Sequence, residues 1–255
     1  MKLSKESIER ILDLQKMENS YVLCFGNDNN SILIDMVIKY LGGSIIQFKD
    51  IEKEKNTELD YTILIFVGNL KDNDINNIEK TLALLGNRTK IIMDLTGINL
   101  SINKRDFALS LMKRYDINLI KGNEKELITL IKSYNIFKEH QIIYLARILG
   151  CIIIETDKSY LTDGYNEVRV IDIEDLLKED EVINIIYNCL ITIGISHCKE
   201  RGEKLQYSII QLIALNFNFK LVNGEIELYD FINKITKVDA ECLEKNCRLC
   251  YSFKR

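Results

Sequence analysis

Proline and tryptophan are absent from the 255-residue sequence, and no apolar run is long enough for a membrane span. A helix that crosses a bilayer needs about 18 or more apolar residues in a row. The N-terminal residues Met1–Glu6 open an amphipathic segment rather than a signal peptide. We therefore expect a cytoplasmic protein without a membrane partner.

Long basic runs are also missing, and the formal net charge is −4. Proteins bind nucleic acid through clustered Lys and Arg side chains. Since such clusters are missing here, nucleic acid is not an expected partner. Apolar residues make up 47% of the chain, which is enough for a large core. Because Gly/Ser linkers and repeats are lacking, we expect a single domain over residues 1–236 and a tail over 237–255.

Metal-binding residue types are few. His140 and His197 are the two histidines, and the seven cysteines form an odd number. Cys242, Cys247 and Cys250 have spacings that zinc sites use, but a fourth ligand is not evident near them. In a cytoplasmic protein we expect reduced, mostly buried thiols. Whether the C-terminal cluster binds a metal stays open.

Short apolar runs alternate with helical patterns along most of the chain. The run Tyr61–Val67 is almost unbroken, which is typical of a strand covered on both faces. This alternation predicts an α/β layered fold with a central, mostly parallel sheet flanked by helices. After a hairpin over 160–171, residues 173–236 are predicted to be helical, with Val182–Gly194 buried. The other strands are predicted at 21–25, 44–48, 90–94, 117–121 and 151–156.

Two carboxylates follow apolar strands in this pattern. Asn123 and Glu126 have the spacing of a helix-capping pair directly after a strand that ends at Gly122. Asp94 ends another apolar strand, at the sheet edge where α/β folds bind ligands. A carboxylate beside a helix N-terminus at that edge can hold hydrated Mg²⁺ near phosphates. The alternative is that both carboxylates serve only as caps and turn residues.

A series of short motifs resembles the hydroxyethylthiazole kinase family of the ribokinase-like superfamily. Residues 121–127 (Lys-Gly-Asn-Glu-Lys-Glu-Leu) are similar to the family's Arg-Gly-Asn-x-x-Glu-Ile, and 91–97 (Ile-Ile-Met-Asp-Leu-Thr-Gly) to its Val-Val-Leu-Asp-Pro-Val-Gly. Weaker matches occur in the family's order at 23–27, 41–44, 66–70 and 155–164. The resemblance covers about residues 20–236 and implies a ribokinase-like fold.

The resemblance also implies an activity and a set of ligands. It implies ATP- and Mg²⁺-dependent phosphorylation of the hydroxyl of 4-methyl-5-(2-hydroxyethyl)thiazole in thiamine salvage. By the resemblance, Asp94 and Glu126 would hold Mg²⁺ through water molecules. Lys121, Asn123 and Thr156 would bind the nucleotide phosphates.

The substrate side follows from the same resemblance. Asn27 and Gly68 would line the thiazole pocket. In the family this pocket lies between the subunits of a trimer, so a homotrimer is expected.

The chain departs from the family at its Gly-x-Gly-Cys motif, whose backbone N–H groups bind the transferring phosphoryl group. The corresponding residues, 181–186, contain neither Gly nor Cys, and Asp157 places a negative charge beside the expected phosphate site. The nearest substitute is Gly194–Cys198, which makes Cys198 the candidate catalytic residue. The alternative to a kinase is therefore a catalytically degraded relative that acts as a small-ligand-binding or interaction protein.

Overall fold

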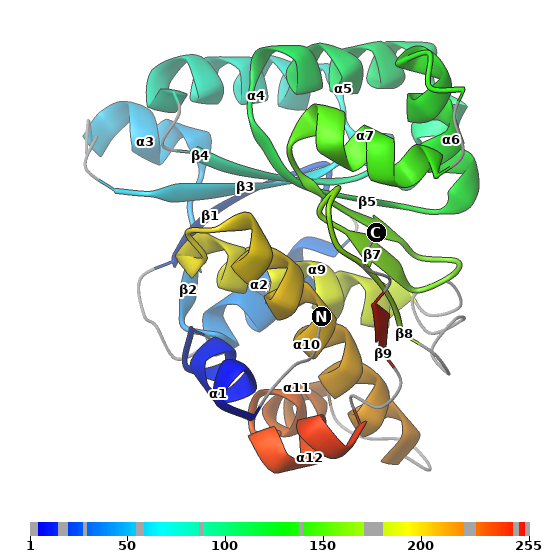
Figure 1. Cartoon of the computed structure of the whole chain (residues 1–255). Coiled ribbons are helices and arrows are strands. Elements are labelled where there is room, and N and C mark those ends of the chain that lie inside the picture. Colours follow the sequence, from blue (N-terminus) through cyan, green and yellow to red (C-terminus); the bar gives the residue numbers. More distant parts are fainter. Residues whose placement is uncertain are drawn as a thin grey trace.

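The protein, seen in a computed structural model, has one central sheet between two layers of helices (Figure 1). The structure describes residues 5–14, 20–27, 30–54, 59–86, 89–137, 140–170, 181–221, 228–246 and 250–252.

The sheet has nine strands in the described residues, in the spatial order β2-β1-β3-β4-β5-β6-β7-β8-β9. The first six strands in this order, from β2 through β1 to β6, pair in parallel with one another. Strands β7, β8 and β9 extend the sheet by antiparallel pairing. The strands are β1 (Ser20–Phe25), β2 (Gly43–Ile45), β3 (Tyr61–Phe66), β4 (Thr89–Asp94), β5 (Ile117–Gly122), β6 (Ile152–Glu155), β7 (Tyr160–Thr162), β8 (Glu167–Val170) and β9 (Cys250–Ser252).

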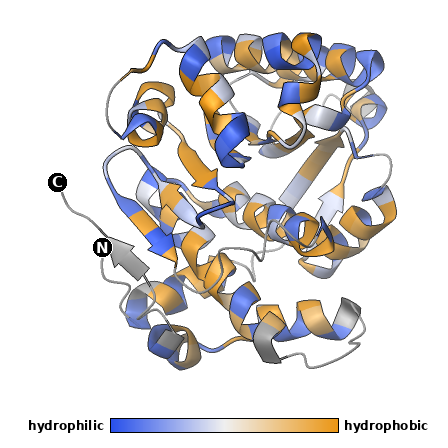
Figure 2. Cartoon of the chain, turned by 90° about the vertical axis from the view of Figure 1, so that its right-hand side faces the viewer, coloured by the Kyte–Doolittle hydropathy of each residue, from blue (hydrophilic) through white to orange (hydrophobic). Residues whose placement is uncertain are grey.

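The helices form two layers, each with its own hydrophobic cluster against one face of the sheet (Figures 1 and 2). The first layer contains α3 (Phe48–Glu54), α4 (Asp72–Leu85), α5 (Ile102–Arg114), α6 (Glu124–Ser133) and α7 (Gln141–Leu149). The second layer contains α1 (Lys5–Leu14), α2 (Ser31–Tyr40), α9 (Glu181–His197), α10 (Arg201–Leu221), α11 (Leu228–Thr236) and α12 (Ala240–Asn246). The central strands are therefore apolar on both faces, as in other covered parallel sheets.

Local sequence sets several helix ends. The Ser101 hydroxyl caps α5 by accepting a hydrogen bond from the Lys104 N–H at 3.4 Å. Helices α4 and α7 end at Gly86 and Gly150, whose φ angles of +61° and +67° suit glycine.

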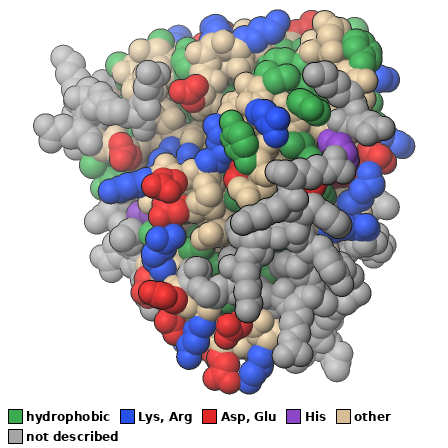
Figure 3. All heavy atoms as spheres, in the orientation of Figure 1, with side chains coloured by type: hydrophobic (Ala, Val, Ile, Leu, Met, Phe, Trp, Pro, Cys, Tyr) green, Lys and Arg blue, Asp and Glu red, His purple; other side chains and the backbone are tan. Residues whose placement is uncertain are grey.

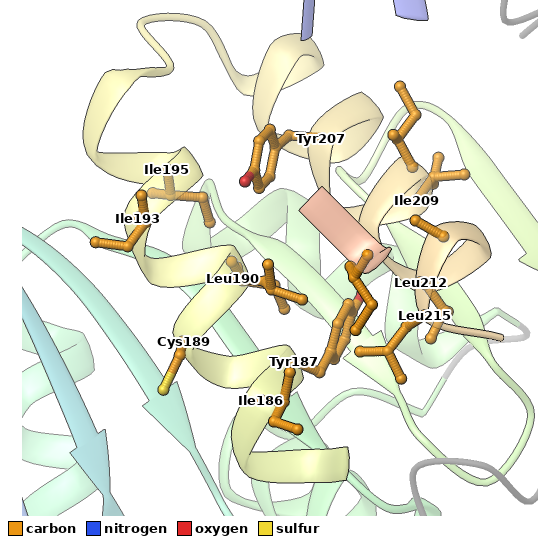
Figure 4. Close-up of a cluster of buried hydrophobic side chains, with 14 of the residues drawn as sticks. Ile186, Tyr187, Cys189, Leu190, Ile193, Ile195, Tyr207, Ile209, Leu212 and Leu215 are labelled. Carbon is orange, nitrogen blue, oxygen red and sulfur yellow. The ribbon is translucent and has the colours of Figure 1, made fainter. Parts of the chain in front are cut away.

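Helix α9 is the most buried helix of the second layer and packs against β1, β3 and β4 as well as α2 and α10. Figure 4 shows its Tyr187 and Leu190 on the side that faces α10, and the Tyr187 hydroxyl donates to the Ser208 carbonyl of α10 at 2.9 Å. Gly194 permits the closest part of this contact, because a Cβ atom there would lie 1.9 Å from Cζ of Tyr207. The glycine of the 194–198 segment therefore serves helix–helix packing.

The predicted fold class is confirmed, and most strands and helices lie within a few residues of their expected positions. The predicted helical stretch 173–236 contains the separate helices α9, α10 and α11, while 171–180 and 222–227 lie outside the described residues. Helix α3 and strand β9 were not predicted because their sequences are short and weakly periodic.

The expected tail over 237–255 contributes to the fold. Helix α12 places Ala240 and Leu243 in the core of the second layer and contacts α1. Strand β9 pairs with β8 through Val170 and Cys250. Cys242 is half-buried, and Cys247 lies outside the described residues.

Among the residues that the structure describes, no helix has the length and the hydropathy needed to cross a membrane.

We expect the substitution Gly194→Ala to lower the free energy of unfolding by about 1–3 kcal/mol, because the added methyl group overlaps the Tyr207 ring. Gly202→Ala, in α10, is the matched control because a Cβ atom there meets no neighbour within 4 Å. The control should be neutral or stabilising by up to about 1 kcal/mol. Urea unfolding followed by circular dichroism measures both, and equal effects would contradict the packing role of Gly194.

Candidate functional site at the carboxyl edge of the sheet

The structure brings the sequence-predicted residues of β4, β5 and β6 together at one edge of the sheet. Asp94, the last residue of β4, pairs in register with Lys121 of β5. The Thr156 N–H, directly after β6, donates to the Gly122 carbonyl at 3.0 Å. Because parallel strands end at the same edge, residues far apart in the sequence become neighbours here.

Asp94 lies in a closed network of protein donors. Its Oδ1 accepts from the Thr96 N–H at 2.9 Å and from the Thr96 hydroxyl at 2.6 Å. Its Oδ2 accepts from Asn188 Nδ2 at 2.7 Å and lies 2.8 Å from Lys121 Nζ. Lys121 Nζ also donates to Asn184 Oδ1. Since a carboxylate has about four lone-pair sites, the partners of Asp94 occupy all of them.

Because this network is buried, the ionisation of Asp94 and that of Lys121 depend strongly on each other. The Asp94 and Lys121 side chains are each 1% exposed. Burial opposes ionisation of Asp94, but the adjacent Lys121 ammonium and the hydrogen bonds from Lys121 and Thr96 outweigh it, so the pKa of Asp94 lies below its usual range. Burial also lowers the pKa of Lys121, an effect that the charge of Asp94 partly offsets.

Glu126 caps helix α6 and also holds the turn after β4. Its Oε2 accepts from the Asn123 N–H at 2.8 Å and its Oε1 from the Gly97 N–H at 2.8 Å. Asn123 returns the cap, because its Oδ1 accepts from the Glu126 N–H at 2.9 Å. Burial raises the pKa of Glu126, although the two backbone N–H groups favour its charged form. Both oxygens of this carboxylate therefore accept hydrogen bonds from backbone N–H groups.

An aspartate side chain from another segment lies at the N-terminus of α6, where the helix dipole would favour a phosphate. The Glu124 N–H donates to Asp157 Oδ2 at 3.0 Å. Lys158, in the same turn, contacts Glu124 and Glu155. A protein carboxylate thus already interacts with the positive end of the helix dipole.

Asn184 and Asn188 were not identified from the sequence. They lie four residues apart on α9 and face the same side of the helix. The signal that could have identified them is this pair of amides on an otherwise apolar, buried helix, since buried polar groups require partners. The partners themselves belong to β4 and β5, more than 60 residues earlier in the chain.

Cys198 lies at the other end of β4 from Asp94. Lys90, near the start of β4, donates to the Cys198 carbonyl at 3.1 Å. Four residues of extended strand separate Lys90 from Asp94, about 13 Å. Burial raises the pKa of the Cys198 thiol to about 12, so the thiol stays protonated at neutral pH.

Asn27 and Gly68 have different surroundings. Asn27 lines a cavity of about 710 Å³ at the carboxyl ends of β1 and β2, which we call the β1–β2 cavity. Gly68 packs against the turn after β4, where a Cβ atom would lie 2.0 Å from the Thr96 carbonyl oxygen. The other residues that line the β1–β2 cavity are Leu23, Cys24, Phe25, Ser31, Ile32, Asp35, Ile45, Ile46, Gln47, Phe48, Lys49, Asn73, Asp74 and Asn77.

The carboxylates do not fit a hydrated Mg²⁺ in this arrangement. Mg²⁺ keeps several water molecules and needs carboxylate oxygens that face them. Asp94 and Glu126, however, are 1% and 5% exposed and direct their oxygens to protein donors. No glycine occurs between Gly164 and Gly194 to form a phosphate-binding turn before or within the start of α9.

We expect Asp94→Asn to lower the free energy of unfolding by about 3–5 kcal/mol, because the buried Lys121 ammonium loses its counter-charge. The double variant Asp94→Asn/Lys121→Met should regain much of this loss, since it removes both charges. Asp35→Asn, which breaks an exposed pair with Lys39, is the control and should cost less than about 0.5 kcal/mol. Equal losses for Asp94→Asn and Asp35→Asn would contradict a buried ion pair.

The lowered pKa of Asp94 also predicts a pH dependence. Above the usual Asp range the carboxylate stabilises the folded protein fully. As the pH falls from about 5 toward 2, the unfolded chain binds a proton first and this stabilisation is lost. Stability curves from urea unfolding should therefore fall more steeply in acid for the natural protein than for Asp94→Asn/Lys121→Met. Parallel curves would refute the prediction.

The comparisons with known proteins are consistent with this fold. No protein-family model matches the chain. Over 80 residues the chain is 32% identical to the hydroxyethylthiazole kinase of Finegoldia magna, a match that covers 31% of this chain and only 30% of that relative.

Solved structures are similar over nearly the whole length. The hydroxyethylthiazole kinase of Pyrococcus horikoshii matches with a TM-score of 0.70 and 16% identity, covering 98% of each chain. A ribokinase-like superfamily protein of Enterococcus faecalis matches with a TM-score of 0.59 and 14% identity, covering 96% of this chain and 95% of that one. The chain therefore has the ribokinase-like fold, and its resemblance to hydroxyethylthiazole kinase is confirmed.

Proposed function

We propose that this protein binds a small polar molecule in the β1–β2 cavity and does not transfer phosphoryl groups through Asp94 and Glu126. The observation that carries the proposal is the closed network around Asp94, in which Lys121 and Asn188 occupy one carboxylate oxygen and Thr96 the other. A carboxylate committed in this way cannot also position a metal–nucleotide complex.

The β1–β2 cavity supports the binding part of the proposal. Its volume of about 710 Å³ lies within the range of small-molecule sites. Apolar side chains such as Leu23, Phe25 and Ile45 line part of it, and Asn27, Gln47 and Asn77 are among its polar groups. It lies at the carboxyl ends of parallel strands, where α/β folds bind ligands. The resemblance favours a heteroaromatic alcohol such as 4-methyl-5-(2-hydroxyethyl)thiazole as the ligand.

A second candidate function is that of a hydroxyethylthiazole kinase. The observation that favours it is the convergence of Asp94, Lys121, Glu126 and Thr156 at one edge of a kinase-like fold. In this candidate Mg²⁺ and ATP bind at that edge, which requires the side chains of α9 to withdraw from Asp94 and Lys121. By the resemblance such a kinase would be a homotrimer in the cytoplasm.

One experiment separates the two candidates. We expect isothermal titration to show saturable binding of hydroxyethylthiazole and no binding of Mg·ATP at about millimolar concentration, and a phosphotransfer assay to yield no thiazole phosphate. Asn27→Ala should weaken thiazole binding about tenfold through the loss of a polar contact. Asn103→Ala, an exposed asparagine on α5, is the matched control and should leave binding unchanged.

The remaining outcomes are also decisive. Saturable Mg·ATP binding together with thiazole phosphate formation would replace the proposal with the kinase. Failure of the thiazole to bind, or binding that is insensitive to Asn27→Ala, would remove the β1–β2 cavity as the site for this ligand.

A further inference from the structure

A second cavity lies between α6, α7 and the β7–β8 hairpin. We call it the α6–α7 cavity, and its volume of about 510 Å³ suits a drug-sized molecule. It shares no lining residue with the β1–β2 cavity or with the Asp94 network. In Figure 3, hydrophobic side chains are visible between charged ones in the upper part of the surface, where α5, α6 and α7 lie.

The inner surface of the α6–α7 cavity is apolar. Leu127 and Ile131 of α6 are buried, and Ile142 and Ile143 of α7 are half-buried. These side chains come from two helices rather than from loops, so the surface is pre-formed. A rigid apolar body, such as an aromatic ring system, would gain stability here through burial of its surface.

One end of the cavity carries excess negative charge. Glu155 is only 2% exposed although it lines the cavity. Lys158 Nζ lies 2.8 Å from Glu155 Oε1 and 2.9 Å from Glu124 Oε1. A single ammonium group, on a side chain that is 47% exposed, therefore faces two carboxylates, one of them desolvated.

The remaining charges do not reverse this balance. Glu167 Oε2 accepts a hydrogen bond from the Tyr160 hydroxyl at 2.8 Å. Burial, followed by the bond to Glu167, raises the pKa of Tyr160, so the phenol stays neutral and does not compensate the carboxylate. Arg169 is the other cationic side chain beside Lys158, so the lining contains three carboxylates and two cations.

We propose that the α6–α7 cavity is a binding site for a small organic cation with a flat apolar body. The ring would lie against Leu127, Ile131 and Ile142, and the protonated amine would bind Glu155 and Glu124 alongside Lys158. An anion of the same shape would meet two carboxylates and an ammonium group that is already paired. The sign of the ligand charge therefore determines affinity.

Three indole compounds test this proposal because they share a ring and differ in charge: tryptamine, tryptophol and indole-3-acetate. We expect isothermal titration of the full chain to show saturable binding of tryptamine and at least about tenfold weaker binding of indole-3-acetate, with tryptophol between them. Glu155→Gln should weaken tryptamine binding about tenfold and leave tryptophol unchanged.

Two further variants make the outcome decisive. Ile142→Trp fills the cavity from a half-buried position and should abolish binding of all three compounds. Glu79→Gln, which removes an exposed carboxylate paired with Arg114, is the matched control and should change nothing. Equal affinity for the cation and the anion, or tryptamine binding that survives both Glu155→Gln and Ile142→Trp, would overturn the proposal.

Discussion

The buried ion pair between Asp94 and Lys121 connects the parts of this structure. It joins β4 to β5, and through Asn188 and Asn184 it joins the sheet to α9, the central helix of the second layer. Two charges removed from water are tolerated only when their remaining hydrogen-bonding capacity is filled. Thr96 and the two asparagines fill it, so the position of α9 and the ionisation of the pair depend on each other.

This constraint limits which groups at the sheet edge are available to a ligand. A phosphoryl-transfer site needs carboxylates, cations and backbone N–H groups that remain available to the ligand. Here Asp157 interacts with the N-terminus of α6, Glu126 binds two backbone N–H groups, and Lys121 faces the interior. These residues are bonded to other protein groups in this structure, while the β1–β2 and α6–α7 cavities remain accessible.

The sequence predicted the parallel sheet well because its evidence is local. Apolar runs such as Tyr61–Val67 and the capping pair Asn123 and Glu126 act within a few residues, and the structure contains both features. The resemblance to hydroxyethylthiazole kinase rested on motifs of this kind and was confirmed. Helix α3 and strand β9, which are short and lack a clear period, were not predicted.

Local sequence patterns were enough to predict the layered α/β fold, the strand that ends at Asp94 and the cap at Glu126, because hydrophobic periodicity and capping are short-range effects. The contacts of Asp94 depend on the packing of the whole chain, because its partners Lys121 and Asn188 are 27 and 94 residues away in the sequence. The tertiary structure likewise placed Cys198 at the far end of β4 and assembled the α6–α7 cavity from two helices and a hairpin. Such pairings depend on how the layers pack, which no single segment encodes.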